Sequence, residues 1–200
     1  MKAKVRPLAA IALLAASLFS APAAAQSLQD RLAICLGCHG AKGQSELPLT
    51  PSLGGQPEFF LIAQLFLFRE GRRDNEVMTA AAKGLSNDDL RAFAQQISKL
   101  PPPVSPAQGA DAARFTRGQA LARKKNCGVC HNADFSGGEQ IPRIANQRED
   151  YVLKSLRDYR KGVRIGYGGA AMVEELAGLF DDELVDLAHF LAHQPAATRK

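Results

Sequence analysis

The feature that most constrains this 200-residue chain is a five-residue string that occurs twice. The segment Cys35-x-x-Cys38-His39 returns 92 residues later as Cys127-x-x-Cys130-His131, and the two strings hold all four cysteines. Residues after each string also match in the same order. The pairs 91 residues apart are Pro51 and Pro142, Gln56 and Gln147, Phe60 and Tyr151, Leu65 and Leu156, Phe68 and Tyr159, Gly71 and Gly162, and Arg73 and Arg164. Self-similarity of this extent indicates a tandem duplication and predicts two similar domains.

A proline-rich segment, Pro101–Pro106, lies between the two copies. Because proline cannot continue a helix and favours extended backbone, residues 101–109 are predicted to be a linker. The expected domains are therefore residues 26–100 and residues 110–195.

The N-terminus has the three parts of a secretory signal peptide. Three basic residues precede the apolar run Leu8–Phe19, and the small residues Ala23–Ala25 follow it. We expect residues 1–25 to be cleaved and the mature protein to lie in the periplasm. The 12-residue run is too short to cross a bilayer, which takes about 20 residues. Cleavage lowers the formal net charge from +5 to +2, so nucleic acid is not expected as a partner.

Apolar residues recur at helical spacing in both copies, and no alternating strand pattern competes with them. We expect an all-α fold with three helical segments in each copy. Ser27 with Asp30, and Ser86 with Asp89, have the spacing of helix-capping pairs, and Asp181 is the expected cap in the second copy. Domains of about 75 residues bury little apolar surface, so a large apolar cofactor is expected to complete each core.

The string Cys-x-x-Cys-His is a signal for covalent attachment of haem c. Its two thiols, one helical turn apart, add across the two vinyl groups, and the histidine is placed to ligate the iron. Cys35, Cys38, Cys127 and Cys130 are therefore the expected attachment sites of two haem c groups, with His39 and His131 as iron ligands. A pair of disulfides and a zinc site are the alternatives. The second is disfavoured because zinc-binding Cys pairs are usually about 15 to 20 residues apart.

Each iron needs a sixth ligand. Beyond the signal segment the chain has two methionines, Met78 and Met172, one in each copy. Equivalent placement favours them as iron ligands over core packing, the usual role of a lone methionine. A neutral thioether also raises the reduction potential. His189 and His193 have metal-pair spacing, but their counterparts in the first copy are Gln95 and Lys99. We expect these two histidines to be surface residues.

The sequence resembles the class I cytochromes c, and more narrowly the periplasmic di-haem cytochrome c4 family. The resemblance covers nearly the whole mature chain. It rests on the two haem strings, the segments Pro51–Gln56 and Phe60–Arg72, and Met78 followed by Leu85–Leu90. It implies His/Met ligation of both irons and two helical domains related by a pseudo-twofold axis. It also implies that the carbonyls of Pro51 and Pro142 accept the Nδ1–H of His39 and His131.

An iron with strong ligands on both faces has no open position for a substrate, so an electron carrier without catalysis is expected. Its partners would be redox proteins, such as a terminal oxidase or a dehydrogenase, with peripheral association with a membrane-bound complex as one form of contact. Two alternatives stay open: a cytochrome subunit of a membrane oxidase or dehydrogenase complex, and a di-haem peroxidase, which needs one open haem face.

The run Phe59–Phe68 is more apolar than one core-facing stripe requires, because only Gln64 interrupts it. Either this extra face is buried against the second domain, or part of it is a docking surface for a redox partner. In the second case, Ile62 and Leu67 would tolerate polar substitution without loss of stability.

Overall fold

The computed structural model describes residues 27–106 and 109–195. The predicted signal peptide, residues 1–25, lies outside these ranges. Within them the secondary structure is α-helical, with no strand and one isolated bridge between Gly138 and Ile141. The expected all-α fold is confirmed.

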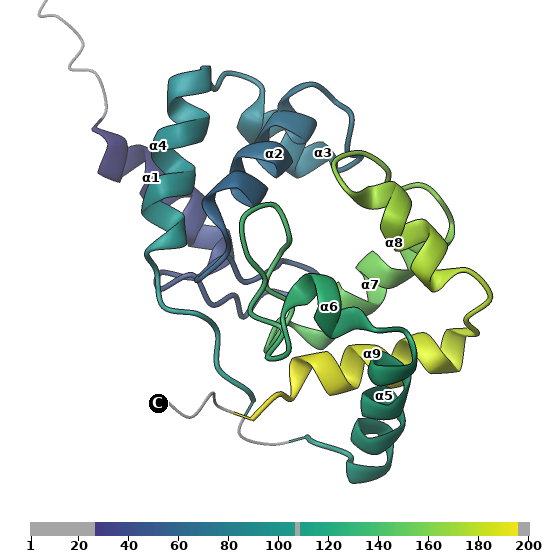
Figure 1. Ribbon diagram of the computed structural model, residues 1–200. Coiled ribbons are helices and arrows are strands. Elements are labelled where there is room, and N and C mark those ends of the chain that lie inside the picture. The colour runs from purple at the N-terminus through teal and green to yellow at the C-terminus, as the bar shows by residue number, and fades with distance from the viewer. Residues whose placement is uncertain (1–26, 107–108, 196–200) are drawn as a thin grey trace, which may run out of the picture.

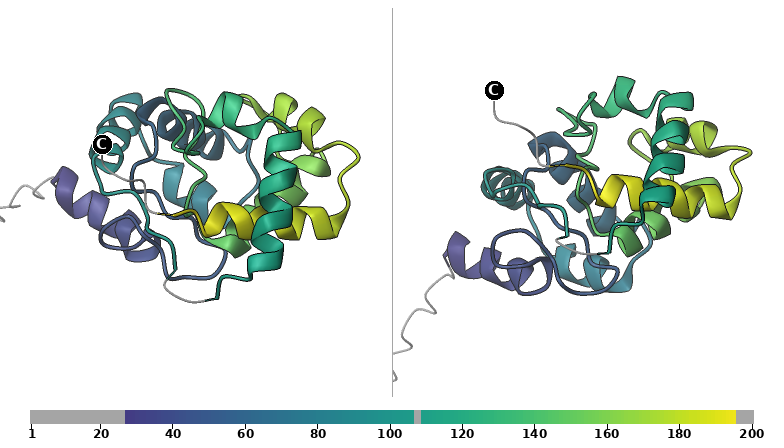
Figure 2. Two further views of the ribbon diagram at one scale, coloured as in Figure 1. Left: turned by 60° about the horizontal axis from the view of Figure 1, so that its bottom comes forward. Right: turned by 90° about the horizontal axis from the view of Figure 1, so that it is seen from below.

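In the described ranges, four helices form before the proline-rich segment and five after it. The first half contains α1 (Leu28–His39), α2 (Glu58–Arg69), α3 (Glu76–Ala82) and α4 (Asn87–Ser98), and the second contains α5 (Ala112–Lys124), α6 (Cys127–His131), α7 (Glu149–Arg160), α8 (Gly169–Leu176) and α9 (Asp181–Ala192). Figure 1 shows the two halves in purple to teal and in green to yellow, and both views in Figure 2 place them side by side. We expected three helical segments in each copy, which is fewer than the structure contains. The additional helices are short, and a repeat of apolar residues cannot be recognised over the length of α3, α6 or α8.

The predicted caps hold at two helices and fail at a third. Ser27 accepts a hydrogen bond from the backbone N–H of Asp30, and Ser86 forms a reciprocal capping box with Asp89. Asp181 is not the cap of α9, because the helix already includes it. Phe180 precedes the helix, and the Glu183 carboxylate accepts its N–H. Asp181 instead accepts hydrogen bonds from Arg157 and Arg160, which join α9 to α7.

Each half has its own apolar cluster. In the first half, buried residues of α1, α2 and α4 form one cluster, which includes Leu32, Leu61 and Phe93. In the second half, α5 and α7 pack against α9, and their cluster includes the fully buried Leu184 and Ala188. Because the two clusters share no buried residue, each half builds a separate core around its own helices.

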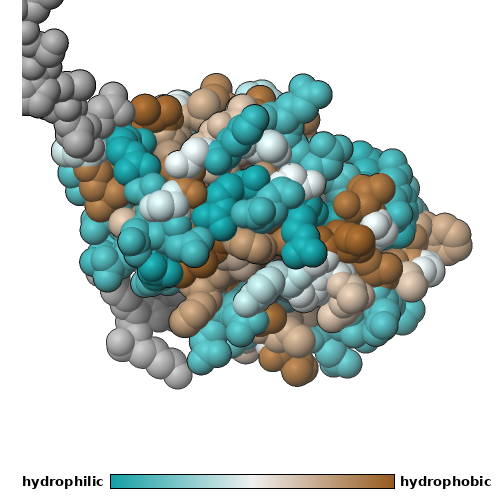
Figure 3. Space-filling model, turned by 90° about the horizontal axis from the view of Figure 1, so that it is seen from above, coloured by the Kyte–Doolittle hydropathy of each residue, from teal (hydrophilic) through white to brown (hydrophobic). Residues whose placement is uncertain are grey.

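The apolar face of α2 is partly covered by the second half. Leu67 is 6% exposed, and a Cβ placed on Gly166, in the loop between α7 and α8, would lie 3.4 Å from its Cδ2 atom. Leu67 is therefore buried at the contact between the halves, as expected if the extra apolar face of Phe59–Phe68 packs against the second domain. Phe59, at the start of the run, is 64% exposed. On the face shown in Figure 3, hydrophobic residues lie in several separate groups between hydrophilic ones.

Among the residues that the structure describes, no helix combines the length and the apolar character needed to cross a lipid bilayer.

Candidate functional site

The two Cys-x-x-Cys-His strings lie on α-helices of different length. The first occupies the end of α1, which runs without a break to His39. The second forms the short helix α6, separated from α5 by Asn126 in the left-handed conformation with φ 52°. Asparagine tolerates this conformation better than most residues, because its short polar side chain hydrogen-bonds locally. The second string thus starts from a turn that re-aims the chain after α5.

All four thiols are free. Cys35 and Cys127 are partly buried, while Cys38 and Cys130 are exposed. Within the described residues, the one cluster of metal-ligating side chains contains no cysteine. The structure therefore provides neither the pair of disulfides nor the zinc site that were the alternatives to haem attachment.

The two histidines of the strings are buried and oriented alike. His39 is 6% exposed and His131 is 7% exposed. The Nδ1 atom of His39 lies 2.8 Å from the carbonyl oxygen of Pro51, and that of His131 lies 2.9 Å from the carbonyl oxygen of Pro142. A carbonyl only accepts hydrogen bonds, so both Nδ1 atoms carry the proton. The contacts that the resemblance implies for Pro51 and Pro142 are confirmed.

Burial also selects the protonation state of these rings. It lowers the pKa of both histidines, and the hydrogen bonds to the proline carbonyls only partly oppose this effect. Each imidazole is therefore neutral, with its proton on Nδ1 and a lone pair on Nε2. A metal ion requires this form of the ring, and a hydrogen bond from the opposite nitrogen fixes ring orientation and increases ligand basicity.

One cavity of about 680 Å³ brings the candidate ligands of both halves together. His39, His131, Met78 and Met172 all line it, as do Cys127 and Cys130, whereas Cys35 and Cys38 do not. Met78 comes from α3 and Met172 from α8, the short helices that occupy equivalent places in the two copies. A loop with two glycines at positive φ, Gly166 and Gly168, leads into α8.

The same cavity holds arginines that form no ion pair with a carboxylate among the described residues. Arg73 lies over the ring of Phe68, and Arg164 over the equivalent ring of Tyr159, at 4.5 and 4.6 Å from the ring centroids. Arg73 donates to the amide oxygen of Gln64 and, at 2.8 Å, to the hydroxyl of Tyr151. Burial raises the pKa of Tyr151, but the charges of Arg164 and Arg73 outweigh this effect and bring that pKa to about 7. Five basic residues line the cavity against three acidic ones, so its lining has an excess of positive charge; they are Arg73, Lys125, Arg143, Lys154 and Arg164, against Asp74, Asp158 and Glu175.

A haem fits this donor set. Its apolar macrocycle suits an apolar cavity, and its carboxylates suit guanidinium groups that have no carboxylate partner. Arg143 also lines the cavity, and its buried Nε atom has no hydrogen-bond partner among the described residues. No sequence motif indicated a role for these arginines, although the matching positions of Arg73 and Arg164 in the repeat were a usable signal.

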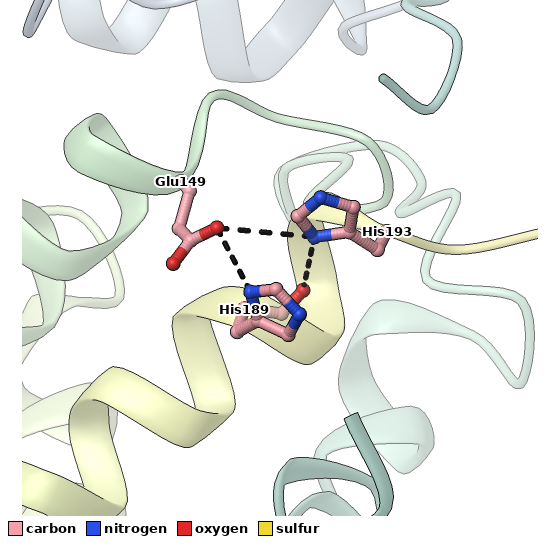
Figure 4. A group of neighbouring side chains, drawn as sticks. All are labelled: Glu149, His189 and His193. Atoms are coloured by element: carbon pink, nitrogen blue, oxygen red, sulfur yellow. Dashed lines mark hydrogen bonds and ion pairs between the residues drawn. The ribbon is translucent and has the colours of Figure 1, made fainter. Parts of the chain in front are cut away.

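His189 and His193 are not surface residues, so that expectation was wrong. Their side chains are 3% and 6% exposed and lie beside Glu149, the first residue of α7 (Figure 4). His189 Nδ1 lies 3.0 Å from the Glu149 carboxylate, and its Nε2 accepts the backbone N–H of Asp111 at 2.9 Å. His193 Nδ1 lies 2.9 Å from the carbonyl oxygen of His189. The repeat comparison misled here because the network joins α9 to Asp111, before α5, and to α7.

These hydrogen bonds also disfavour a metal ion at this cluster. Both Nδ1 atoms that face Glu149 carry protons, because a carboxylate and a carbonyl accept from them. Binding a cation would move the proton of His189 to Nε2, directly against the N–H of Asp111. Neither histidine lines the cavity that contains Met78 and Met172.

Comparison with known proteins supports the interpretation of this chain as a haem-binding cytochrome. The family model named Cytochrome c matches residues 115–195. A thiosulfate dehydrogenase electron acceptor of Thiomonas intermedia is 32% identical, over 98% of this chain and 94% of that protein. A cytochrome c4 of Thiocapsa roseopersicina is 30% identical, over 79% of this chain and 85% of that protein.

Two solved structures extend the likeness to three dimensions. Cytochrome c4 from Pseudomonas stutzeri is similar with a TM-score of 0.76 and 27% identity, over 86% of this chain and 100% of that one. A thiosulfate dehydrogenase from Marichromatium purpuratum is similar with a TM-score of 0.70 and 29% identity, over 83% of this chain but 38% of that one. The chain belongs to the cytochrome c4 family of di-haem class I cytochromes c, which bind two covalent haem c groups and carry electrons without being enzymes.

Proposed function

We propose that Cys35 and Cys38 attach one haem, ligated by His39 and Met78, and that Cys127 and Cys130 attach a second, ligated by His131 and Met172. The observation that carries this assignment is the shared cavity, which both histidines and both methionines line. When bound, each haem supplies an iron that changes between the ferric and ferrous states. The chain holds the imidazole rings of His39 and His131 through hydrogen bonds from their Nδ1–H groups.

The methionines are preferred over the spare histidines on geometric grounds. Met78 and Met172 line the cavity from equivalent short helices, whereas His189 and His193 do not line it and are tied into hydrogen bonds with Glu149 and with backbone groups. Moving either spare histidine to an iron would break those hydrogen bonds.

The attachment sites are tested by removing one pair of cysteines. The purified protein should keep its haem colour after denaturation and acid extraction, and replacing Cys35 and Cys38 together with alanine should remove half of it. Replacing Cys127 and Cys130 should remove the other half. Extraction of all colour from the unsubstituted protein into organic solvent contradicts covalent attachment.

The methionines are tested by the weak sulfur-to-iron charge-transfer band of the ferric protein. Met78→Ala and Met172→Ala should each reduce this band by about half, since each removes one of two thioether ligands. His193→Gln is the matched control and should leave the band unchanged. If neither methionine variant alters the band or the reduction potentials, the assignment is wrong.

The domain boundaries and the cellular location follow from the same assignment. We propose two cytochrome c domains at 26–100 and 110–195, joined by the linker 101–109, with residues 1–25 as the signal peptide that exports the chain to the periplasm. The separate apolar clusters of the two halves support this division. N-terminal sequencing of the protein from a periplasmic extract tests the cleavage site.

For the electron donor we propose a thiosulfate dehydrogenase. Two observations support this choice: the Thiomonas intermedia relative is named as the electron acceptor of such an enzyme, and the Marichromatium purpuratum enzyme contains a similar fold in 38% of a longer chain. Each chain would take two electrons, one on each haem. Mixing the ferric protein with a thiosulfate dehydrogenase and thiosulfate should reduce both haems rapidly. Reduction no faster than with thiosulfate alone, alongside rapid reduction by another dehydrogenase, contradicts this partner.

A further inference from the structure

Two buried glutamines, one in each half, form equivalent hydrogen bonds to the opposite half. Gln56 and Gln147 occupy equivalent positions in the repeat, and each is 5% exposed. The amide oxygen of Gln147 accepts the backbone N–H of Ser52 at 2.8 Å, while its Nε2 donates to the carbonyl oxygen of Ser52, also at 2.8 Å. Gln56 makes the same pair with Arg143, at 3.1 and 2.8 Å.

The residues held by these amides directly follow the two prolines. In the peptide group between Pro51 and Ser52, the carbonyl accepts the Nδ1–H of His39 and the N–H donates to Gln147. The peptide group between Pro142 and Arg143 is held in the same way by His131 and Gln56. One peptide group therefore connects each histidine to a glutamine of the opposite half.

We propose that Gln56 and Gln147 are positioning residues that tune the two haem potentials crosswise. This proposal rests on His39 and His131 being iron ligands. Gln147 acts on the haem of the first half through Ser52, Pro51 and His39. Gln56 acts on the haem of the second half through Arg143, Pro142 and His131.

The physical basis is the polarisation of a shared peptide group. A hydrogen bond from the peptide N–H to the glutamine oxygen increases the negative charge on the carbonyl oxygen, so this oxygen becomes a stronger acceptor. A stronger acceptor at Nδ1–H makes the imidazole a more basic ligand. A more basic ligand favours ferric over ferrous iron, so each glutamine lowers the potential of the haem in the other half.

The orientation of the ring gives a second effect in the same direction. The glutamine bonds the N–H of this peptide group and the carbonyl of the next one, and so limits how far the proline carbonyl turns away from the imidazole. Without the amide, the hydrogen bond from Nδ1–H lengthens, and the Nδ1 proton exchanges with solvent more often.

The test replaces each glutamine with leucine, which keeps the bulk and, unlike methionine, adds no thioether beside the iron. In Gln147→Leu, we expect the equilibrium constant for reduction of the His39 haem to rise about twofold. This corresponds to a rise of about 18 mV in its reduction potential, since tenfold corresponds to 59 mV for one electron. The His131 haem should move by less than half as much. Gln56→Leu should give the mirrored result.

The two potentials are measured separately by following haem methyl resonances during a redox titration, assigned with the Met78→Ala and Met172→Ala variants. Hydrogen exchange supplies a second readout, in which the Nδ1–H of His39 should exchange faster in Gln147→Leu and that of His131 should not. A role in packing alone would shift both haems together, or the haem of the substituted half.

Gln44→Leu is the matched control, because Gln44 also accepts a distant backbone N–H, that of Val104, but contacts no histidine-bound peptide. It should shift neither potential. Equal shifts of both haems in the Gln147 variant, or a shift of the His131 haem alone, overturn the proposal. If Gln147→Leu does not fold, Gln147→Asn is too short to reach Ser52 and takes its place. A wild-type spectrum without two His/Met haems refutes the proposed function instead, before any glutamine is changed.

Discussion

The substitution Gly118→Ala is expected to disrupt the second half while leaving the first intact. Gly118 lies on α5 where this helix crosses α9. A Cβ at this position would lie 2.2 Å from the carbonyl oxygen of Asp186 and 2.6 Å from Cβ of Phe190. Carbon atoms normally approach carbonyl oxygens to about 3.3 to 3.6 Å. The two helices must therefore separate by about 1 Å to admit one methyl group.

The size of the effect follows from two opposing contributions. Alanine is favoured over glycine in a helix by about 1 kcal/mol. Overpacking costs about 1 to 3 kcal/mol, and the upper end applies because neither a helix carbonyl nor a Cβ atom can rotate out of the way. The net loss is about 2 kcal/mol. For a domain of 60 to 100 residues this lowers Tm by about 10 °C.

Thermal unfolding of the holoprotein, followed by circular dichroism and by haem absorbance, measures this loss. Only the transition of the second half should move. The ferric charge-transfer band should decrease by no more than half, because α5 leads into the Cys127 string and α9 supplies Leu187 and Leu191 to the cavity. Gly84→Ala is the control, since a Cβ there meets nothing within 4 Å, and it should change stability by less than about 0.5 kcal/mol. An unchanged or higher Tm for Gly118→Ala would refute the close helix crossing.

Two further predictions concern single contacts. Hydrogen bonds from Arg31 and Ser86 hold the pKa of Asp89 well below its usual value, so its contribution to stability is present above about pH 4 and is lost as the pH falls. Asp89→Asn should destabilise the protein by about 1 kcal/mol at pH 7. Urea titrations should show this difference decreasing steadily as the pH falls below about 4, because the folded-state carboxylate takes up its proton only well below its usual pKa. Leu67→Gln should lower the free energy of unfolding by about 2 to 4 kcal/mol, because it places an amide at the buried contact with Gly166. Unchanged stability with slower electron transfer to a partner would restore the docking interpretation.

Sequence reasoning was most effective where local chemistry decides structure. The Ser27 and Ser86 caps depend on side chains three residues away, and the repeat placed Gln56, Arg73 and Met78 opposite their counterparts without any structure. It failed where a distant segment decides the environment. His189 is buried because α7 brings Glu149 to it and the chain before α5 brings the N–H of Asp111. Nothing near position 189 carries that information, and comparison with Gln95 in the first copy pointed the wrong way.

The manner in which the halves are joined bears on how this cytochrome works. Apolar clusters stabilise each half separately, whereas buried hydrogen bonds from Gln56 and Gln147 cross between the halves. Buried polar groups are costly when they lose their partners, so these bonds fix one relative orientation of the halves. The bonds end on the peptide groups that orient His39 and His131. A movement that separates the halves therefore also loosens the support of both histidines. With the proposed ligands, the geometry of each iron site would then depend on the contact between the two halves.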